Sequence, residues 1–318
     1  FMPALYSSNE LPRIMVYDQG HSRLVGELEN SESIRTYTAE SVAQVEEFVS
    51  DTDQPRLGLI LPADLDQTLD AGESPTLRGL VVHWAGKKDV AELQLFYEEQ
   101  LTQLAGQPVR IDLEGEGVYP QAIGGGRGFL TSMAVLLALS MMGISTVTHL
   151  ILEEKQTKTL DALLVSPASI RQVVMGKALA GLFYCLMGAA AVFALNAGIV
   201  LHWGLAIVTV VSGALFTVAV GLLLGSIFEN KQQLTLWGFL IFNILLIPAF
   251  LSIMTDLLPA NVIAFLRWVP TVALSLLIRT SFTGSVSLAP ILRDLGLLLA
   301  SALVVYAAVV WRVRRTDA

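Results

Sequence analysis

The chain has 318 residues, of which 53% are hydrophobic and 15% are charged, and its formal net charge is −8. Soluble domains average about 25% charged residues, so this composition excludes an ordinary soluble protein and indicates a membrane protein. The acidic balance also argues against nucleic acid as a partner.

The charge is divided unevenly along the chain. Residues 1–127 contain 21 Asp and Glu against 9 Lys and Arg, a net charge of −12, whereas the remainder contains 7 against 11, a net charge of +4. An acidic, water-soluble piece therefore precedes a slightly basic membrane piece. We predict an α/β domain over residues 1–122 and a transmembrane domain over residues 123–318.

The first domain shows alternating strand and helix patterns. Short apolar runs predict strands, and apolar residues spaced by three and four predict helices. The predicted strands are residues 13–17, 57–61 and 80–84, and the predicted helices are residues 41–49 and 89–104. This alternation predicts a mixed sheet that is covered by helices.

Two polar features of this domain resemble ligand sites. Asp64, Asp66 and Asp70 could hold a metal ion, but acidic residues also favour a helix N-terminus, which is our interpretation. The glycine-rich residues 124–128 lack the GxxxxGK[ST] pattern of a phosphate loop and follow no predicted strand. We therefore expect them to form a flexible hinge before the membrane.

Five apolar runs after residue 127 are long enough to cross a hydrocarbon core about 30 Å thick. The predicted spans are residues 129–152, 173–200, 205–228, 234–253 and 295–311. Residues 255–287 are also apolar, but prolines interrupt them, which favours interfacial or re-entrant helices.

The basic tail with Arg312, Arg314 and Arg315 predicts a cytoplasmic C-terminus, because positively charged residues favour the cytoplasmic side. The turn at residues 229–233 would then also be cytoplasmic. Counting back through five spans places residues 1–122 outside the cytoplasm. A span upstream of Phe1 would be needed to carry this domain outside, so we expect six spans in the full protein.

Residues 153–177 form the one markedly polar segment of any length between two predicted spans. Leu160, Leu163 and Leu164 lie at i, i+3 and i+4, which predicts a short helix with one apolar face. Pro167 ends it, because proline lacks the N–H and restricts the preceding residue. Such a helix suits docking onto a soluble partner, although an ordinary connecting loop would give the same pattern.

The polar segment also carries a recurring motif: a Glu-rich stretch with threonines, then Leu-Leu-x-Ser-Pro, then Gly-Lys at the foot of the next helix. The motif positions are Glu153, Glu154, Thr157, Thr159, Leu163, Leu164, Ser166, Pro167, Gly176 and Lys177. A second series on the other side of the membrane is Leu251-Ser252, Leu258-Pro259, Val269-Pro270-Thr271 and Arg279. Together these motifs resemble the ABC-2 family of ABC-transporter permeases. The glycine that usually precedes the threonine is replaced here by Gln156 or Lys158.

The resemblance implies a type V exporter-like permease in a bacterial inner membrane. It implies that residues 153–171 couple to a separate ATPase subunit, with Leu160 on the contacting face. ATP and Mg²⁺ would then be bound by that ATPase, because no P-loop motif occurs in this chain, and we expect neither cofactor nor catalytic residues here. A second permease copy or paralogue and membrane lipid would be the other partners.

The function that the resemblance implies is the outward movement of a drug, lipid, glycolipid or peptide. The alternative is a mechanotransmission or signalling protein that moves its outer domain without transporting a substrate. Families of that kind typically have three spans after the outer domain, so five spans favour the exporter.

Three positions inside the spans serve either a substrate path or helix packing. Gly221 and Gly225 form a GxxxG pattern, which permits close helix approach within the chain or between copies. Asn243 lies in mid-span and must face protein or a cavity, because a polar group in lipid is costly. Ser145 and His149 lie one turn apart, but no orienting acid accompanies them, so we do not expect an intramembrane enzyme.

Overall fold

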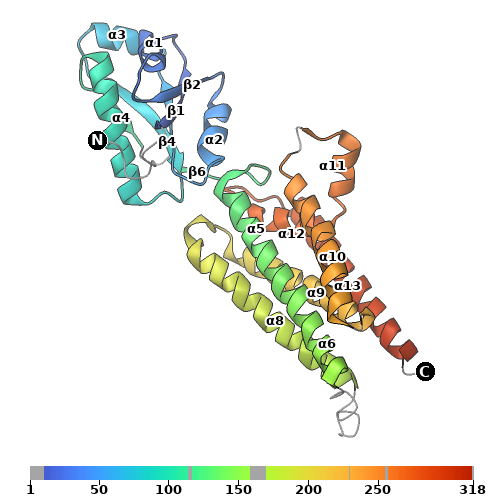
Figure 1. Cartoon of the computed structure of the whole chain (residues 1–318). Coiled ribbons are helices and arrows are strands. Elements are labelled where there is room, and N and C mark those ends of the chain that lie inside the picture. The colour runs from blue at the N-terminus through green and yellow to red at the C-terminus, as the bar shows by residue number, and fades with distance from the viewer. Residues whose placement is uncertain (1–10, 114–116, 158–169, 229, 255–256, 317–318) are drawn as a thin grey trace. The chain divides into compact units, whose positions relative to one another are not determined.

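A computed structural model describes most of the chain, and its ribbon is drawn in Figure 1. The described residues are 11–113, 117–157, 170–228, 230–254 and 257–316. The chain forms two compact units, Phe1–Gly128 and Phe129–Ala318, so the boundary lies six residues beyond the predicted one.

The first unit is built on a mixed sheet, which has six strands within the described residues. The strand order is β2-β1-β3-β4-β5, with β6 paired to β4. β1 is parallel to β2 and β3, β3 is antiparallel to β4, and β4 is parallel to β5 and β6. The bounds are β1 Arg13–Asp18, β2 Arg35–Ala39, β3 Leu57–Leu61, β4 Thr76–Val82, β5 Arg110–Asp112 and β6 Gly117–Val118.

Helices cover both faces of this sheet (Figure 1). Because side chains alternate along a strand, Ile14 and Val16 of β1 point to one face and Met15 and Tyr17 to the other. The first face packs against α1, α3 and α4, and the second face packs against α2. The bounds are α1 Arg23–Glu29, α2 Val42–Ser50, α3 Leu65–Asp70 and α4 Lys87–Ala105.

The predicted α/β character of this unit is confirmed. The strand predicted at residues 80–84 lies instead at Thr76–Val82. Its first half is partly polar and pairs with β5, so a search for apolar runs did not detect it. The sequence patterns missed α1, β2, β5 and β6, which are short and carry few apolar residues.

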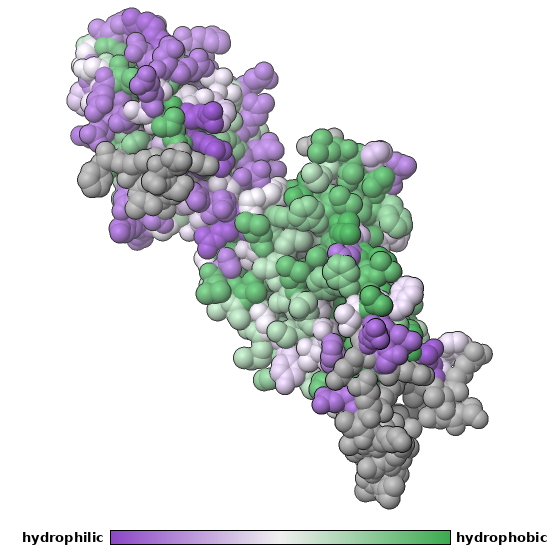
Figure 2. All heavy atoms as spheres, in the orientation of Figure 1, coloured by the Kyte–Doolittle hydropathy of each residue, from purple (hydrophilic) through white to green (hydrophobic). Residues whose placement is uncertain are grey.

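The second unit is helical, and five of its described helices are long and apolar enough to cross a membrane, as predicted. Figure 2 shows the contrast in hydropathy, with polar residues over the first unit and apolar residues over the second. The bounds are α5 Gly126–Ser140, a π-helix (η1) Met141–Thr146, α6 Val147–Thr157, α8 Ile170–Leu195, α9 Trp203–Ile227, α10 Lys231–Leu251 and α13 Leu288–Thr316. The first span is α5, η1 and α6 together, over Gly126–Glu153.

Two span boundaries differ by five residues or more from those predicted. The second span ends at Leu195 rather than at residue 200, because the Asn196 amide donates to the Val192 carbonyl and a short 3-10 turn, η2 Ala197–Ile199, follows. The last helix begins at Leu288, seven residues earlier than predicted, since Pro290 lies in its first turn, where proline is tolerated.

The interrupted apolar segment before the last span forms two helices, α11 Ala260–Leu266 and α12 Pro270–Thr280, which meet at an angle of 83°. Pro270 begins α12, as suits a residue without an N–H. A sharp break of this kind fits a re-entrant or broken span.

Helix α9 lies at the centre of the membrane unit. In its most apolar stretch 72% of the residues are buried, compared with 11% in α10. The helices α6, α8 and α13 pack directly on α9, whereas α10 packs on α12, the later helix of the membrane unit.

Candidate functional site

The polar segment between the first two spans is only partly described. The predicted coupling residues outside the described residues are Thr159, Leu160, Leu163, Leu164, Ser166 and Pro167. Glu154 and Thr157 lie in the last turn of α6, and Glu153 just before them is exposed. The end of α6 and the start of α8 lie at the same end of the bundle (Figure 1).

Lys177 holds the two helices together at this end. Its Nζ donates a hydrogen bond to the Leu150 carbonyl of α6 at 3.1 Å, and the residue is only 8% exposed. Leu150 lies seven residues before the end of α6, so this bond pairs a buried ammonium group with a carbonyl inside the helix. The lysine therefore sets the spacing of the helices that frame the polar segment.

The arginine tail lies at this same end. Arg312 of α13 donates from Nε to the Ser226 carbonyl of α9 at 3.2 Å. The preceding residue, Gly225, lies against Ile151 of α6. The end of α13 and the end of α6 are thus brought together by the last turn of α9.

Both glycines of the GxxxG pattern pack inside this chain. A Cβ at Gly221 would lie 2.3 Å from the carbonyl oxygen of Gly143, and one at Gly225 would lie 2.7 Å from Ile151 Cδ1. Real Cβ atoms do not approach so closely, so α9 needs glycine at both positions to pack on the first span.

Asn243 is half-buried on α10. Its Nδ2 donates to the Phe239 carbonyl of the same helix at 2.8 Å, so the amide donor is used within α10 rather than by another helix. His149 Nδ1 donates to the backbone carbonyl of Ser145 at 2.8 Å, which is the contact that the structure gives between these two residues.

The opposite end of the bundle contains a buried arginine. Arg279 of α12 is 1% exposed, and its guanidinium carbon lies 5.7 Å from the centre of the Phe129 ring of α5. The hydroxyls of Ser132 and Ser275 lie 3.3 Å apart and also join α5 to α12. This arrangement anchors the bent helix pair against the start of the first span.

Besides Lys177 and Arg279, the membrane unit buries another charged residue, Asp294, which sequence reasoning missed. It is 6% exposed and pairs with its neighbour Arg293 at 2.7 Å, at the start of α13. The available signal was an adjacent Arg and Asp in an otherwise apolar span, which demands mutual neutralisation.

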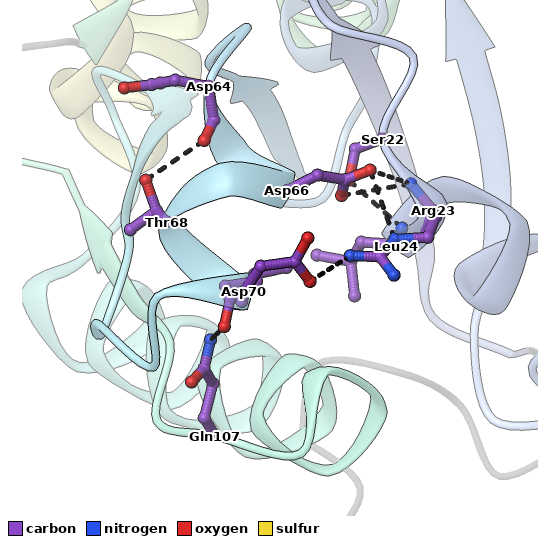
Figure 3. A network of polar contacts seen from close by, with 9 residues as sticks. Ser22, Arg23, Leu24, Asp64, Asp66, Thr68, Asp70 and Gln107 are labelled. Carbon is purple, nitrogen blue, oxygen red and sulfur yellow. Dashed lines mark hydrogen bonds and ion pairs between the residues drawn. The ribbon is translucent and has the colours of Figure 1, made fainter.

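Of the three aspartates considered as metal ligands, Asp66 and Asp70 join α3 to the start of α1 (Figure 3). Asp66 accepts hydrogen bonds from Ser22 Oγ at 2.7 Å and from the Arg23 N–H, and Asp70 pairs with the Arg23 guanidinium. The Ser22 hydrogen bond is the main cause that holds the pKa of Asp66 below its ordinary value. Asp64 comes just before α3. Across the described residues no group of three His, Cys, Asp or Glu could hold a metal ion.

The predicted hinge at residues 124–128 is packed rather than loose. Gly126 has φ +61°, and a Cβ there would lie 2.3 Å from the Thr52 nitrogen. Arg127 donates its N–H to the Thr52 carbonyl at 2.9 Å, and its guanidinium carbon lies 4.6 Å from the centre of the Trp84 ring. Glycine is required here for close approach and a left-handed backbone, not for flexibility.

Comparison with known proteins gives one match. A family model described as "ABC-2 family transporter protein" matches residues 1–311, which include the first unit and the five candidate spans. No curated protein and no solved structure matches the chain.

Proposed function

The chain belongs to the ABC-2 family of transporter proteins, and from this premise we propose that it is the permease subunit of an ATP-driven exporter. The substrate that we propose is hydrophobic or amphipathic, and its direction is outward. The ATPase subunit would bind ATP and Mg²⁺, and a second permease copy or paralogue would complete the transport path.

The observation that carries this proposal is the frame around residues 158–169. Lys177 and the Leu150 carbonyl fix the two helices that hold this segment, and α6 itself packs on the central helix α9. A force applied to the segment would therefore reach the middle of the bundle. The five apolar helices also support an exporter over a mechanotransmission protein, since families of that kind typically have three spans after the outer domain.

We further propose that this end of the bundle faces the cytoplasm and that the α/β unit lies outside, in a bacterial inner membrane. The first span joins the α/β unit to the polar segment, so the two lie on opposite sides if it crosses once. The bond from Arg312 to Ser226 keeps the start of the basic tail beside the last turn of α9, which also contacts α6, and a basic tail favours the cytoplasm.

The test is the change Leu163→Asp in the predicted apolar face of the polar segment. Burying a leucine contributes about 1.5–3 kcal/mol, so losing it should weaken ATPase binding by roughly 10- to 100-fold. Binding is measured by titrating the purified permease in nanodiscs with its ATPase subunit, and ATP turnover is measured in the same samples.

The matched control is Leu95→Asp, since Leu95 is a 67% exposed leucine of α4, far in sequence from the polar segment. It should leave binding and turnover at the parent level. Parent-level binding and turnover in Leu163→Asp would show that the segment is only a connecting loop.

A further inference from the structure

The α/β unit is fixed to the first turn of α5. Arg127, the second residue of that helix, donates its N–H to the Thr52 carbonyl, and its guanidinium carbon lies 4.6 Å from the centre of the Trp84 ring. Gly126 lies so close to Thr52 that a Cβ would come within 2.3 Å of the Thr52 nitrogen. All of these residues belong to the first unit. The depth of this helix start in the membrane therefore also sets the depth of the residues around it.

The start of α5 belongs among the lipid headgroups. The candidate span Gly126–Glu153 has 28 residues, so it is about 42 Å long. A bilayer is about 40–45 Å thick with its headgroups and about 30 Å thick without them, so a span of this length reaches through both headgroup layers. The polar Arg127 before the apolar Phe129 fits this placement of the first turn.

The sheet brings two connections of the chain to this point. β4 and β6 are parallel and paired, so both strands end at the same edge of the sheet. His83 and Tyr119 follow these two strands, and their ring centres lie 4.8 Å apart. From here the chain continues to α4 on one side and to α5 on the other. We call residues 83–88 and 119–128 together the β4–β6 edge.

The β4–β6 edge exposes residues that suit a membrane surface. Tyr119 is 46% exposed and Ile123 is 56% exposed, and Trp84 is half-buried beneath the Arg127 guanidinium. Tryptophan and tyrosine are enriched where membrane meets water, because their rings are apolar and each carries one polar atom that can stay hydrated. The exposed side chains of this edge are therefore better matched to headgroups than to bulk water.

The charges of the β4–β6 edge differ from those of the unit as a whole. The unit is acidic, but this edge contains Lys87, Lys88 and Arg127 and no Asp or Glu. Both lysines are exposed, so their ammonium groups can reach a phosphate. Asp51 at the end of α2 also lies here, against the glycines before α5, and is the neighbour that these cations offset.

The opposite edge of the sheet carries acidic connections. β3 is antiparallel to β4, so β3 and its parallel neighbour β1 end at the edge away from the start of α5. The connections there contain Asp18, Asp64, Asp66 and Asp70, of which Asp66 and Asp70 pair with Arg23. The strand directions thus keep these carboxylates away from the lipid phosphates that would repel them.

We propose that the β4–β6 edge docks on the surface of the lipid bilayer. Tyr119 and Ile123 lie among the headgroups, and Lys87 and Lys88 face lipid phosphates. The contact holds the α/β unit against the membrane beside the first span. It goes beyond the proposed function, since it requires only that this span crosses the membrane and does not depend on the substrate or on the direction of transport.

The experiment measures how deep spin labels lie in the full chain in nanodiscs of phosphatidylethanolamine and phosphatidylglycerol. Ile123→Cys reports on the β4–β6 edge, and Gln67→Cys, at an exposed site of α3 beyond the opposite edge, is the water reference. Leu130→Cys, at a 54% exposed site of α5, is the hydrocarbon reference, and the fully buried Cys185 should not be labelled. Power-saturation EPR gives the accessibility of each label to oxygen, which concentrates in lipid, and to a water-soluble nickel chelate.

We expect the ratio of oxygen to nickel accessibility at Ile123→Cys to be severalfold higher than at Gln67→Cys and lower than at Leu130→Cys. Adding Lys88→Glu should lower the ratio at Ile123→Cys, because a carboxylate is repelled by lipid phosphates. The matched control is Arg110→Glu, since Arg110 is exposed at the start of β5, at the opposite edge. This change should leave the ratio at Ile123→Cys at the parent value.

A ratio at Ile123→Cys equal to that at Gln67→Cys would overturn the proposal, because the edge would then face water. Low accessibility to both reagents would also overturn it, since a protein partner or a second copy of the chain would then cover the edge. An unchanged ratio in the Lys88→Glu variant would overturn the contact between the lysines and lipid phosphate.

Discussion

The two units of this protein bury opposite kinds of residue. In the α/β unit, leucines such as Leu59 are fully buried between sheet and helices, and charges such as those of Arg23 and Asp70 lie outside. In the membrane unit, Leu195 is 82% exposed, while Gly221 and Thr217 are buried in α9. Water drives apolar side chains inward, whereas lipid does not, so close packing and hydrogen bonds must hold the helices together.

The comparison therefore predicts that glycines matter most in one unit and large apolar residues in the other. Each of the following substitutions tests the packing of one unit and is paired with a control substitution or condition.

The largest effect should come from Gly221→Leu in α9. The new side chain would strike the Gly143 backbone, which cannot move aside as a flexible side chain can, so we expect a loss of more than about 3 kcal/mol of stability. Thermal unfolding in nanodiscs measures it. Gly296→Leu in α13 is the control, because a Cβ there meets nothing within 4 Å. Equal unfolding temperatures for the two variants would contradict the close packing of α9.

The next effect should come from Leu59→Ala in β3. Leu59 is fully buried in the core under α1, α3 and α4, so its truncation should cost about 2–5 kcal/mol. Urea unfolding of the full chain, followed by circular dichroism, measures it. Leu303→Ala in α13 is the control, since that side chain is 69% exposed and should change stability very little. A comparable loss in the control would mean that this surface is not in contact with lipid alone.

The smallest effect should come from Asp66→Asn in the α/β unit. Asp66 holds the first turn of α1 through Ser22 and Arg23, so the loss should be about 1 kcal/mol at neutral pH. The folded pKa of Asp66 lies below its ordinary value of 3.8, so its contribution is present above that pH and disappears as the pH falls through the folded pKa. Unfolding curves of the parent and the variant at pH 7 and pH 3 should therefore converge at the lower pH. A difference that does not shrink on acidification would assign the stabilisation to another group.

Much of the fold could be predicted from apolar patterns, and the failures have physical causes. The run at residues 57–61 predicts β3 because buried strands are continuously apolar. Helix α1 was missed because it has only seven residues, so its Ser22 cap and its two buried leucines, Leu24 and Leu28, form too short a pattern. The π-helix was missed because it changes the hydrogen-bond ladder and not the apolar composition of the span.

In the candidate site too, some features follow from local sequence patterns and others depend on contacts between distant residues. The motif in residues 153–177 and the GxxxG pattern are local, so both could be found in the sequence. The bond from Lys177 to the Leu150 carbonyl and the contact between Gly221 and Gly143 join different spans, so spacing along the chain does not reveal them. Predicting Gly125 and Gly126 as a hinge failed for a related reason, since here glycine permits close approach to Asp51 and Thr52.

The central claim is that the first span separates an acidic outer domain from the cytoplasmic end that receives the ATPase. The most direct test is labelling of intact cells with a membrane-impermeant maleimide, using Glu47→Cys in α2 and Gln232→Cys in α10 as separate single variants. Both native side chains are exposed, and the fully buried Cys185 should not react. We predict that Glu47→Cys is labelled in intact cells and that Gln232→Cys is labelled only after lysis. Labelling of Gln232→Cys in intact cells, or of Glu47→Cys only after lysis, would contradict the account.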